Sequence, residues 1–184
     1  MMTILSMVFV FGAFASCSKD NDDEGNGGGN SSGDITVKYG GYYNFKGEDE
    51  WMLEFSNYDI LGTPPLGKND ITVLSINFEA ADGSSLPVGE FSDFAVYLVK
   101  NGKIEVEAKE IDGDLYFGES MGGRNGKLTI SKSGDKYTVS LSNVKLVESI
   151  DGGTGKTIDN ASFSFTGSLS LLPDEMFEYD DEEE

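Results

Sequence analysis

Apolar and polar residues alternate along most of the chain, from Ile35 to Leu171. The alternation is cleanest in residues 71–80 and 161–171, where every second side chain is apolar and Ser, Thr or Asn often stand between. The other alternating segments are 35–39, 43–45, 51–55, 94–100, 103–111, 115–117, 128–130 and 137–146. A period of two predicts β-strands with one buried and one wet face. No window sustains the helical period, so the pattern predicts an all-β fold.

Strands that are wet on one side favour antiparallel pairing. The dipeptide Asn101-Gly102 predicts a two-residue hairpin turn, and residues 133–135 predict a second turn. Roughly 8 to 10 strands in one domain predict an antiparallel β-sandwich. The alternative is a lipocalin-like up-and-down β-barrel, which is less favoured because the loops 61–68 and 150–157 interrupt a regular meander.

The N-terminus carries a short apolar segment, residues 4–14. It is too short to span a bilayer core of about 30 Å as a stable helix. Its length suits the apolar region of a signal peptide, and the small residues Ala15 and Ser16 suit a processing site. We therefore expect residues 1–16 to be a cleaved signal peptide.

The residues Phe14-Ala15-Ser16-Cys17 resemble a bacterial lipobox, with Phe14 in place of the usual Leu. The run that follows resembles the acidic export signal of Bacteroidota surface lipoproteins; its charged residues are Lys19, Asp20, Asp22, Asp23 and Glu24. The resemblance implies acylation of Cys17 and permanent anchoring, since two or more acyl chains hold a protein firmly to a membrane. It also implies an outer-membrane location facing the cell exterior, with the periplasmic face as the alternative.

Composition divides the rest of the chain into three parts. Residues 17–34 are rich in Gly, Asn, Ser and Asp and are expected to form a lipidated, disordered tether. Residues 35–173 form the single all-β domain, and residues 174–184, with eight acids, form an acidic disordered tail. The net charge of −20 and the lack of a basic stripe exclude nucleic-acid binding.

The chain offers little catalytic chemistry. It has no histidine, so Gly118-Glu119-Ser120-Met121-Gly122, although it fits a nucleophile-elbow pattern, lacks the base of a serine triad. We expect no cofactor and no metal; Asp112 and Asp114 are the candidates for a calcium site but fit a solvated turn better. We expect no enzymatic activity. The remaining catalytic possibility is a carboxylate-based glycosidase, with candidate acids at Glu105, Glu107, Glu110 and Glu119.

Aromatic residues supply the candidate ligand platform: Tyr42, Trp51 and Tyr58. Exposed rings on a sheet can stack on sugar faces. The sequence therefore favours a surface-anchored, non-catalytic β domain that binds an extracellular glycan or protein. The alternatives are a lipocalin-like carrier of a small apolar ligand, and a structural subunit of a surface complex whose strand 161–171 is open to strand addition.

Overall fold

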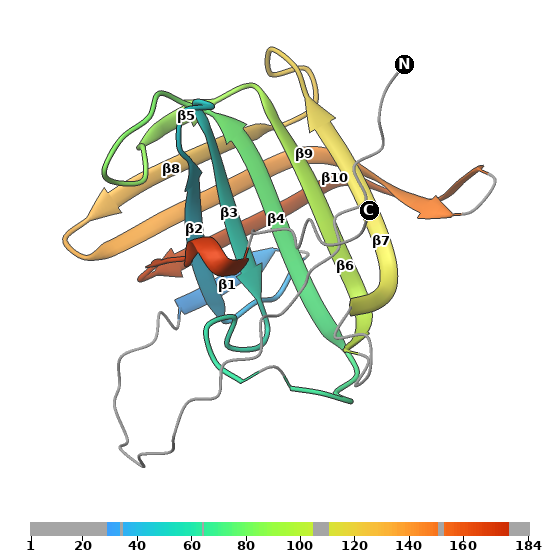
Figure 1. Ribbon diagram of the computed structural model, residues 1–184. Helices are drawn as coiled ribbons and strands as arrows, with labels where there is room; N and C mark the ends of the chain where they lie inside the picture. Colours follow the sequence, from blue (N-terminus) through green and yellow to red (C-terminus); the bar gives the residue numbers. More distant parts are fainter. Residues whose placement is uncertain (1–28, 34, 64, 105–110, 151–152, 177–184) are drawn as a thin grey trace, which may run out of the picture.

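The structure is a computed structural model and describes residues 29–33, 35–63, 65–104, 111–150 and 153–176 (Figure 1). These residues are almost entirely β-strand, which confirms the all-β prediction. The strands are β1 (Gly29–Gly33), β2 (Tyr39–Phe45), β3 (Glu50–Ser56), β4 (Ile71–Glu79), β5 (Gly89–Phe91), β6 (Phe94–Ile104), β7 (Ile111–Ser120), β8 (Lys127–Ser133), β9 (Lys136–Ile150), β10 (Gly153–Gly167) and β11 (Ser170–Leu171). A 3₁₀ turn, η1, follows at Asp174–Met176.

All eleven described strands belong to one hydrogen-bonded sheet, in the order β1-β10-β9-β7-β6-β4-β3-β2-β11. Strand β9 pairs with β8 along its first half and with β7 near Val147. Strand β5 pairs with β8. The predicted antiparallel pairing holds except between β2 and β11, which are parallel. The strand β9 therefore belongs to both halves of the sheet.

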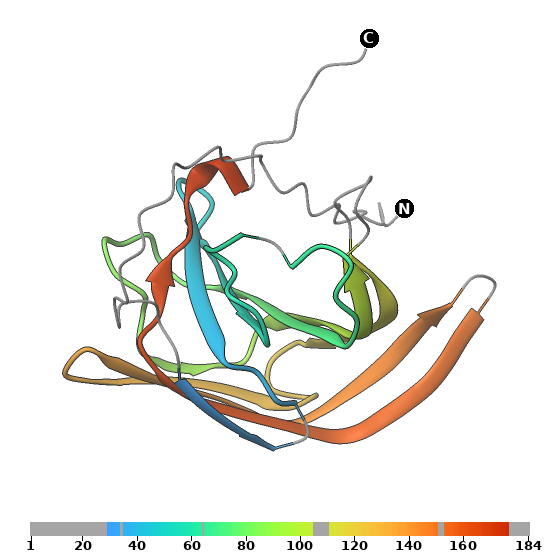
Figure 2. The same ribbon diagram turned by 90° about the horizontal axis from the view of Figure 1, so that it is seen from below.

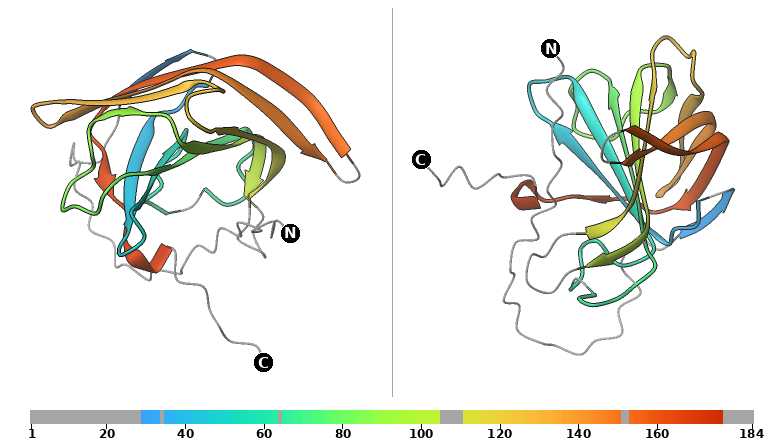
Figure 3. Two further views of the ribbon diagram at one scale, coloured as in Figure 1. Left: turned by 90° about the horizontal axis from the view of Figure 1, so that it is seen from above. Right: turned by 90° about the vertical axis from the view of Figure 1, so that its right-hand side faces the viewer.

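The sheet curls so that β8, β9 and β10 face β3 and β4, as Figures 2 and 3 show from below and above. The result is a half-barrel: two layers face each other as in a sandwich, but β9 joins them as in a barrel. The end strands β1 and β11 do not pair with each other in the described part of the chain.

A larger core fills the space inside the curl. Alternate residues of β3, β4, β6, β8, β9 and β10 supply it, which is the face that the alternating pattern predicts. At its centre the ring of Phe55 lies 4.9 Å from the ring of Phe163 and 5.1 Å from that of Phe165, and all three side chains are buried. Aromatic rings at such separations add to the burial energy.

A smaller core covers the opposite face of β3 and β4, which we call the outer face. Its buried members are Met52, Tyr58, Ile60, Ile71, Val73, Ile104 and Leu172. Two segments supply the cover: residues 57–63, which follow β3, and residues 170–176 at the C-terminal end, which Figure 2 shows beside β2. Strand β3 is consequently buried on both faces.

The Asn101-Gly102 dipeptide does not form the hairpin turn that the sequence predicts. Strand β6 runs through it to Ile104, and the register against β7 shifts between Lys100 and Lys103. Asn101 takes a φ of 53°, and Gly102 pairs with Ile71 of β4. The same left-handed backbone that suits a turn here makes a β-bulge, because the strand still has partners on both sides. The second predicted turn does join β8 to β9, with Gly134 at a φ of 58°.

The predicted boundaries also shift at both ends. Five residues of the expected tether, Gly29–Gly33, form β1 and pair with β10, and η1 lies within the expected tail. Strand β10 is thereby paired on both sides at Phe163–Gly167. The expected lipid-attachment residue Cys17 and the expected export signal lie outside the described residues. No described helix is long or apolar enough to cross a membrane.

Truncation of Phe163 tests the larger core. We expect Phe163→Ala to lower the free energy of unfolding by about 3–5 kcal/mol, because the ring is buried against Phe55 and its removal leaves a cavity. Urea denaturation measures the change. Leu66→Ala, at a side chain that is 48% exposed, is the control and should stay within about 0.5 kcal/mol of wild type. Equal effects of the two changes would contradict this assignment of the core.

Candidate functional site

The three aromatic residues proposed as a ligand platform do not share an exposed surface. Trp51 faces the larger core and is 1% exposed, with half-buried Tyr42 tilted beside it at a ring distance of 6.3 Å. Tyr58 lies on the outer face and is 5% exposed. The expectation of an outward Tyr58 is wrong because the chain turns back after Ser56 and folds Tyr58 over the sheet, so the strand's alternation no longer applies. Trp51, packed in the larger core, likewise offers no exposed ring.

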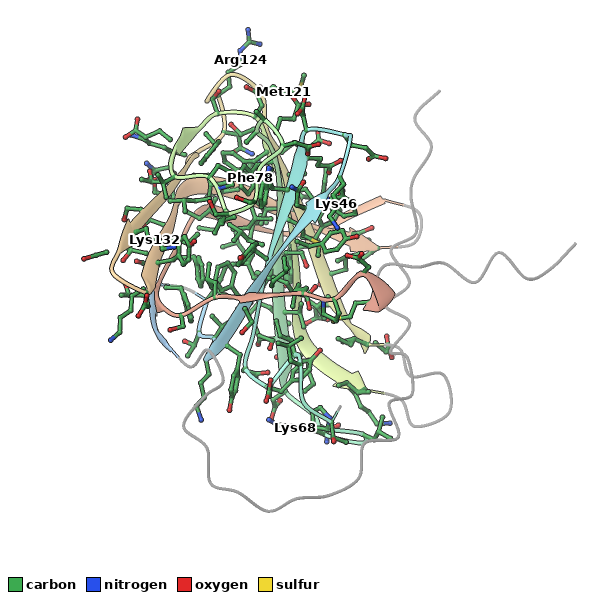
Figure 4. The ribbon with its side chains drawn as sticks, turned by 60° about the vertical axis from the view of Figure 1, so that its left-hand side comes forward. Lys46, Lys68, Phe78, Met121, Arg124 and Lys132 are labelled. Atoms are coloured by element: carbon green, nitrogen blue, oxygen red, sulfur yellow. The ribbon has the colours of Figure 1, made fainter. Side chains whose placement is uncertain are left out.

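The structure instead has a groove of about 370 Å³ at one end of the sheet. It is bounded by the turn before β3, the end of β4, the start of β6 and the end of β7. Its lining residues are Glu48, Glu50, Asn77, Phe78, Glu79, Asp93, Phe94, Ala95, Glu119, Ser120 and Met121. Figure 4 shows Phe78 and Met121 toward this end of the molecule and Lys68 at the other. We call this feature the acidic groove.

Five carboxylates line the acidic groove, and none of its described lining residues is Lys or Arg. Two of the acids, Glu50 of β3 and Glu79 of β4, stand directly opposite each other across the strand pair. Like charges in this position destabilise a sheet. The fold keeps the two charges together even though an uncharged pair would be more stable.

Hydrogen bonds fix the groove's walls. Asp93 accepts bonds from the Gly122 amide, at 2.9 Å, and from the Ser92 hydroxyl, at 2.8 Å. These bonds, the backbone one most, hold the pKa of Asp93 below its usual value, so its carboxylate stays charged. Beside Glu48, Asp82 accepts a hydrogen bond from the Gly47 amide at 2.8 Å, and Asp49 accepts one from the Asp82 amide at 3.0 Å. These bonds hold the β2–β3 turn against the segment after β4.

The floor of the groove combines an amide with a small side chain. Asn77 donates to Glu50 Oε1 at 3.2 Å, while its Oδ1 atom is buried without a hydrogen-bond partner. Its cross-strand neighbour on β6 is Ala95, which in turn pairs with Glu119. The methyl group of Ala95 leaves space between the longer side chains of Asn77 and Glu119, and this space forms part of the hollow.

A ring pair lies on the same face, one row below the groove. Tyr97 of β6 and Phe117 of β7 are directly opposed, half-buried, and 5.2 Å apart between ring centroids. Burial raises the pKa of the Tyr97 hydroxyl, and the nearby carboxylates of Glu119 and Glu50 raise it further. Tyr97 is therefore a neutral hydrogen-bonding group within the field of two groove acids.

Ser120 of the nucleophile-elbow pattern is not exposed for catalysis. It is 2% exposed at the end of β7, which continues into a turn and not a helix, and its hydroxyl accepts from the Asn125 amide at 3.4 Å. Asn125 in turn donates to the carbonyl of Glu119 and accepts from the Lys145 amide at 2.8 Å. These residues brace the β7–β8 loop beside the groove.

The described candidates for a calcium site and for a glycosidase acid lie on β7. Asp112 and Asp114 lie in β7 opposite Lys103 and Lys100, and Asn101 donates to Asp114 at 2.7 Å. The described residues contain no group of three or more Asp, Glu, Cys or His that could hold a metal ion. Of the candidate glycosidase acids only Glu119 is described, and it lines the groove.

The chain matches no protein-family model, and comparison with curated proteins and with solved structures finds no match.

Four of the five groove acids, all except Glu119, are not predicted from the sequence, because the groove combines residues from distant segments. The available signal was weak: Glu48, Glu50 and Glu79 flank strand ends, where solvated charges are ordinary. Only the strand register brings Glu50 and Glu79 opposite each other.

Removal of one opposed charge should stabilise the domain. We expect Glu79→Gln to raise the free energy of unfolding by roughly 0.2–1 kcal/mol at low salt, because Glu50 then faces a neutral side chain. The gain should shrink in 1 M NaCl, where a Debye length of about 3 Å screens the repulsion. Asp159→Asn, at an exposed position of β10, is the control and should leave stability unchanged. Urea denaturation at low salt and in 1 M NaCl measures the free energy of unfolding. An equal gain in stability at both salt concentrations would contradict the explanation by charge repulsion.

Proposed function

We propose that this chain is a surface-anchored outer-membrane lipoprotein whose non-catalytic β domain binds a basic segment of an extracellular protein in the acidic groove. The observation that carries the proposal is the groove's five carboxylates, arranged without a compensating Lys or Arg among its described lining residues. A hollow lined by one sign of charge concentrates the field and attracts the opposite charge.

The groove offers a basic side chain both charge and apolar contact. The apolar residues Ala95 and Met121 lie among the acids, and Met121 is 72% exposed, whereas Phe78 and Phe94 of the lining are buried. The methylene stem of a Lys or Arg can rest on such surface while its charged head meets the carboxylates. A ligand of this kind would also relieve the repulsion between Glu50 and Glu79.

A glycan is the second candidate ligand, and the Tyr97–Phe117 ring pair favours it. The rings are only half-buried and lie beside two groove carboxylates. Sugar hydroxyls can donate hydrogen bonds to carboxylates while a sugar face packs on an aromatic ring. The opposed charges of Glu50 and Glu79 favour the cationic ligand over a neutral one.

The two other hypotheses gain no support. A carrier of a small apolar ligand needs an open interior, whereas Phe55, Phe163 and Phe165 pack against one another at the centre of the larger core. A structural subunit that adds a strand at residues 161–171 needs a free edge, whereas Phe163–Gly167 has neighbours on both sides.

The lipid anchor is the second part of the proposal, and it rests on the lipobox-like Phe14-Ala15-Ser16-Cys17. Eleven residues separate Cys17 from β1, and they can span at most about 40 Å when extended. An acylated Cys17 would therefore keep the domain close to the membrane surface.

Neutralisation of two groove acids tests the binding proposal. We expect Glu50→Gln/Glu119→Gln to weaken binding of a fluorescent oligolysine peptide by roughly 2- to 30-fold, since each exposed ion pair contributes about 0.2–1 kcal/mol. Fluorescence anisotropy at 50 mM and 300 mM NaCl measures it, and wild-type affinity should fall with salt. Asp135→Asn/Asp159→Asn removes the same charge from exposed positions elsewhere and is the matched control.

Two outcomes would reject the basic ligand. Equal weakening by the groove and control variants would show that only the net charge matters. Salt-independent binding of neutral oligosaccharides, lost in Tyr97→Ala, together with no groove-specific peptide binding, would establish the glycan instead.

Replacement of the proposed lipid-attachment residue tests the anchor. We expect Cys17→Ser in the full-length precursor to abolish incorporation of radiolabelled palmitate and to move the protein from the membrane fraction to the soluble fraction. The physical reason is the loss of acyl chains, each buried methylene of which contributes about 0.8 kcal/mol to membrane binding. Ser16→Ala, a small-for-small change beside it, should retain the label. A labelled Cys17→Ser protein would contradict the assignment.

A further inference from the structure

Apart from Asn77 Oδ1 in the groove, two buried polar atoms on the outer face have no hydrogen-bond partner among the described residues. Glu54, in the middle of β3, is 2% exposed, and Tyr58, just beyond the strand, is 5% exposed. The Oε2 atom of Glu54 and the hydroxyl of Tyr58 are both buried and unpaired. Unpaired buried groups of this kind are rare in folded proteins, because each costs free energy. They lie outside the acidic groove, so the proposed function does not explain them.

The cover beside Glu54 includes residue Ile60 of the 57–63 segment and the C-terminal segment 170–176, which we call the strap. Glu54 stands between Gly41 of β2 and Ser75 of β4 in the sheet. A Cβ atom placed on Gly41 would lie 2.5 Å from Leu172 of the strap and 3.1 Å from Ile60. Leu172 and Ile60 therefore rest directly on the backbone beside Glu54, and glycine at position 41 permits this close approach.

Few contacts hold the strap to the body. Strand β11 pairs with β2 at only two positions, and the Leu172 amide donates to the Tyr42 carbonyl at 2.8 Å. Met176 packs against the smaller core, and Asp174 lies 3.8 Å from Lys46 in an exposed ion pair. A short terminal segment with so few bonds opens at a lower free energy than the core strands.

We propose that the strap is a pH-sensitive cap that closes over the outer face when Glu54 is neutral and opens when Glu54 ionises. A charged carboxylate without a partner is far costlier to bury than a neutral carboxyl. Opening of the strap brings water to Glu54 and removes that cost. The strap is the part that yields, because it is a terminal segment held by few bonds, whereas Asn57 ties the 57–63 segment to Asp70 and Thr72 by hydrogen bonds.

The groups around Glu54 do not supply a compensating charge. Tyr58 is the titratable neighbour from the segment after β3, and the Glu54 carboxyl helps to raise its pKa, so the phenol stays neutral. Strand β4 contributes the uncharged Ser75 and Asn77, and β2 contributes Gly41. Asp59, beside Tyr58, accepts from the Leu61 amide at 3.1 Å, and the strap's Asp174 pairs with Lys46 at the surface. Both are acidic and would only strengthen the effect.

Burial alone raises the pKa of Glu54 to about 7. Because the pKa of the closed form lies above that of an exposed Glu, closure is fully favourable below about pH 4.5. It weakens as the pH rises toward 7, where the closed form itself ionises. The cap therefore responds to pH changes just below neutrality, and it closes on acidification.

Hydrogen exchange of the full chain, followed by mass spectrometry at pH 5.5 and 8.0 and corrected for intrinsic exchange rates, tests the cap. We expect the protection of residues 170–176 to be about tenfold or more higher at pH 5.5, since one pKa unit corresponds to a tenfold change in the equilibrium. In Glu54→Gln, protection should be high and equal at both pH values. Glu90→Gln, an exposed acid on β5, is the matched control and should keep the wild-type difference.

Gly41→Ala supplies a second test that does not depend on Glu54. Its added methyl group meets Leu172, so the strap should lose protection at both pH values while β9 and β10 remain protected. Equal wild-type protection at the two pH values, or a pH difference that persists in Glu54→Gln, would overturn the proposal. Loss of protection in β9 and β10 along with the strap at pH 8.0 would also overturn it, because the whole domain would then be opening.

Discussion

Burial of β3 on both faces is the constraint on which the rest of the structure depends. One face of the strand carries Trp51, Leu53 and Phe55 into the larger core, and the other carries Met52 and Glu54 into the smaller one. The sheet must therefore be covered twice. The curl brings β8, β9 and β10 over the first face, and the segment after β3 together with the strap covers the second (Figure 2). Glu54, which the alternating pattern of β3 places on the solvent-facing side, is consequently buried.

The same arrangement determines where the outer face remains open. The cover extends over β2, β3 and the lower part of β4, and it leaves the end formed by Glu50, Asn77, Ala95 and Glu119 free. The acidic groove occupies that end. Its opposed charges lower stability, whereas a sheet selected for stability alone would place opposite or neutral residues there. Stability and the proposed binding of a cation would therefore have opposing requirements along strands β3 and β4.

The groove and the strap lie on one face and share neighbours. Lys46, which pairs with the strap's Asp174, lies two positions before Glu48 of the groove wall in the chain. Glu54 and Glu50 are separated along β3 by a single outer-face position, that of Met52. In the two proposals, ligand charge at one end and protonation at the other would thus act on the same strand, one through carboxylates open to water and the other through a buried carboxyl.

The sequence alone determined the all-β class, most of the strand-forming segments and their inner faces, because the side-chain period of two is a local property of the chain. It also supplied the lipobox resemblance, which is read from consecutive residues. Only the tertiary structure decided that Asn101-Gly102 is a bulge, that Tyr58 is buried, that Gly29–Gly33 joins the sheet, and that Glu50 and Glu79 face each other. Each of these depends on strand register and on which segment covers a face, and both are set by contacts between residues far apart in the chain.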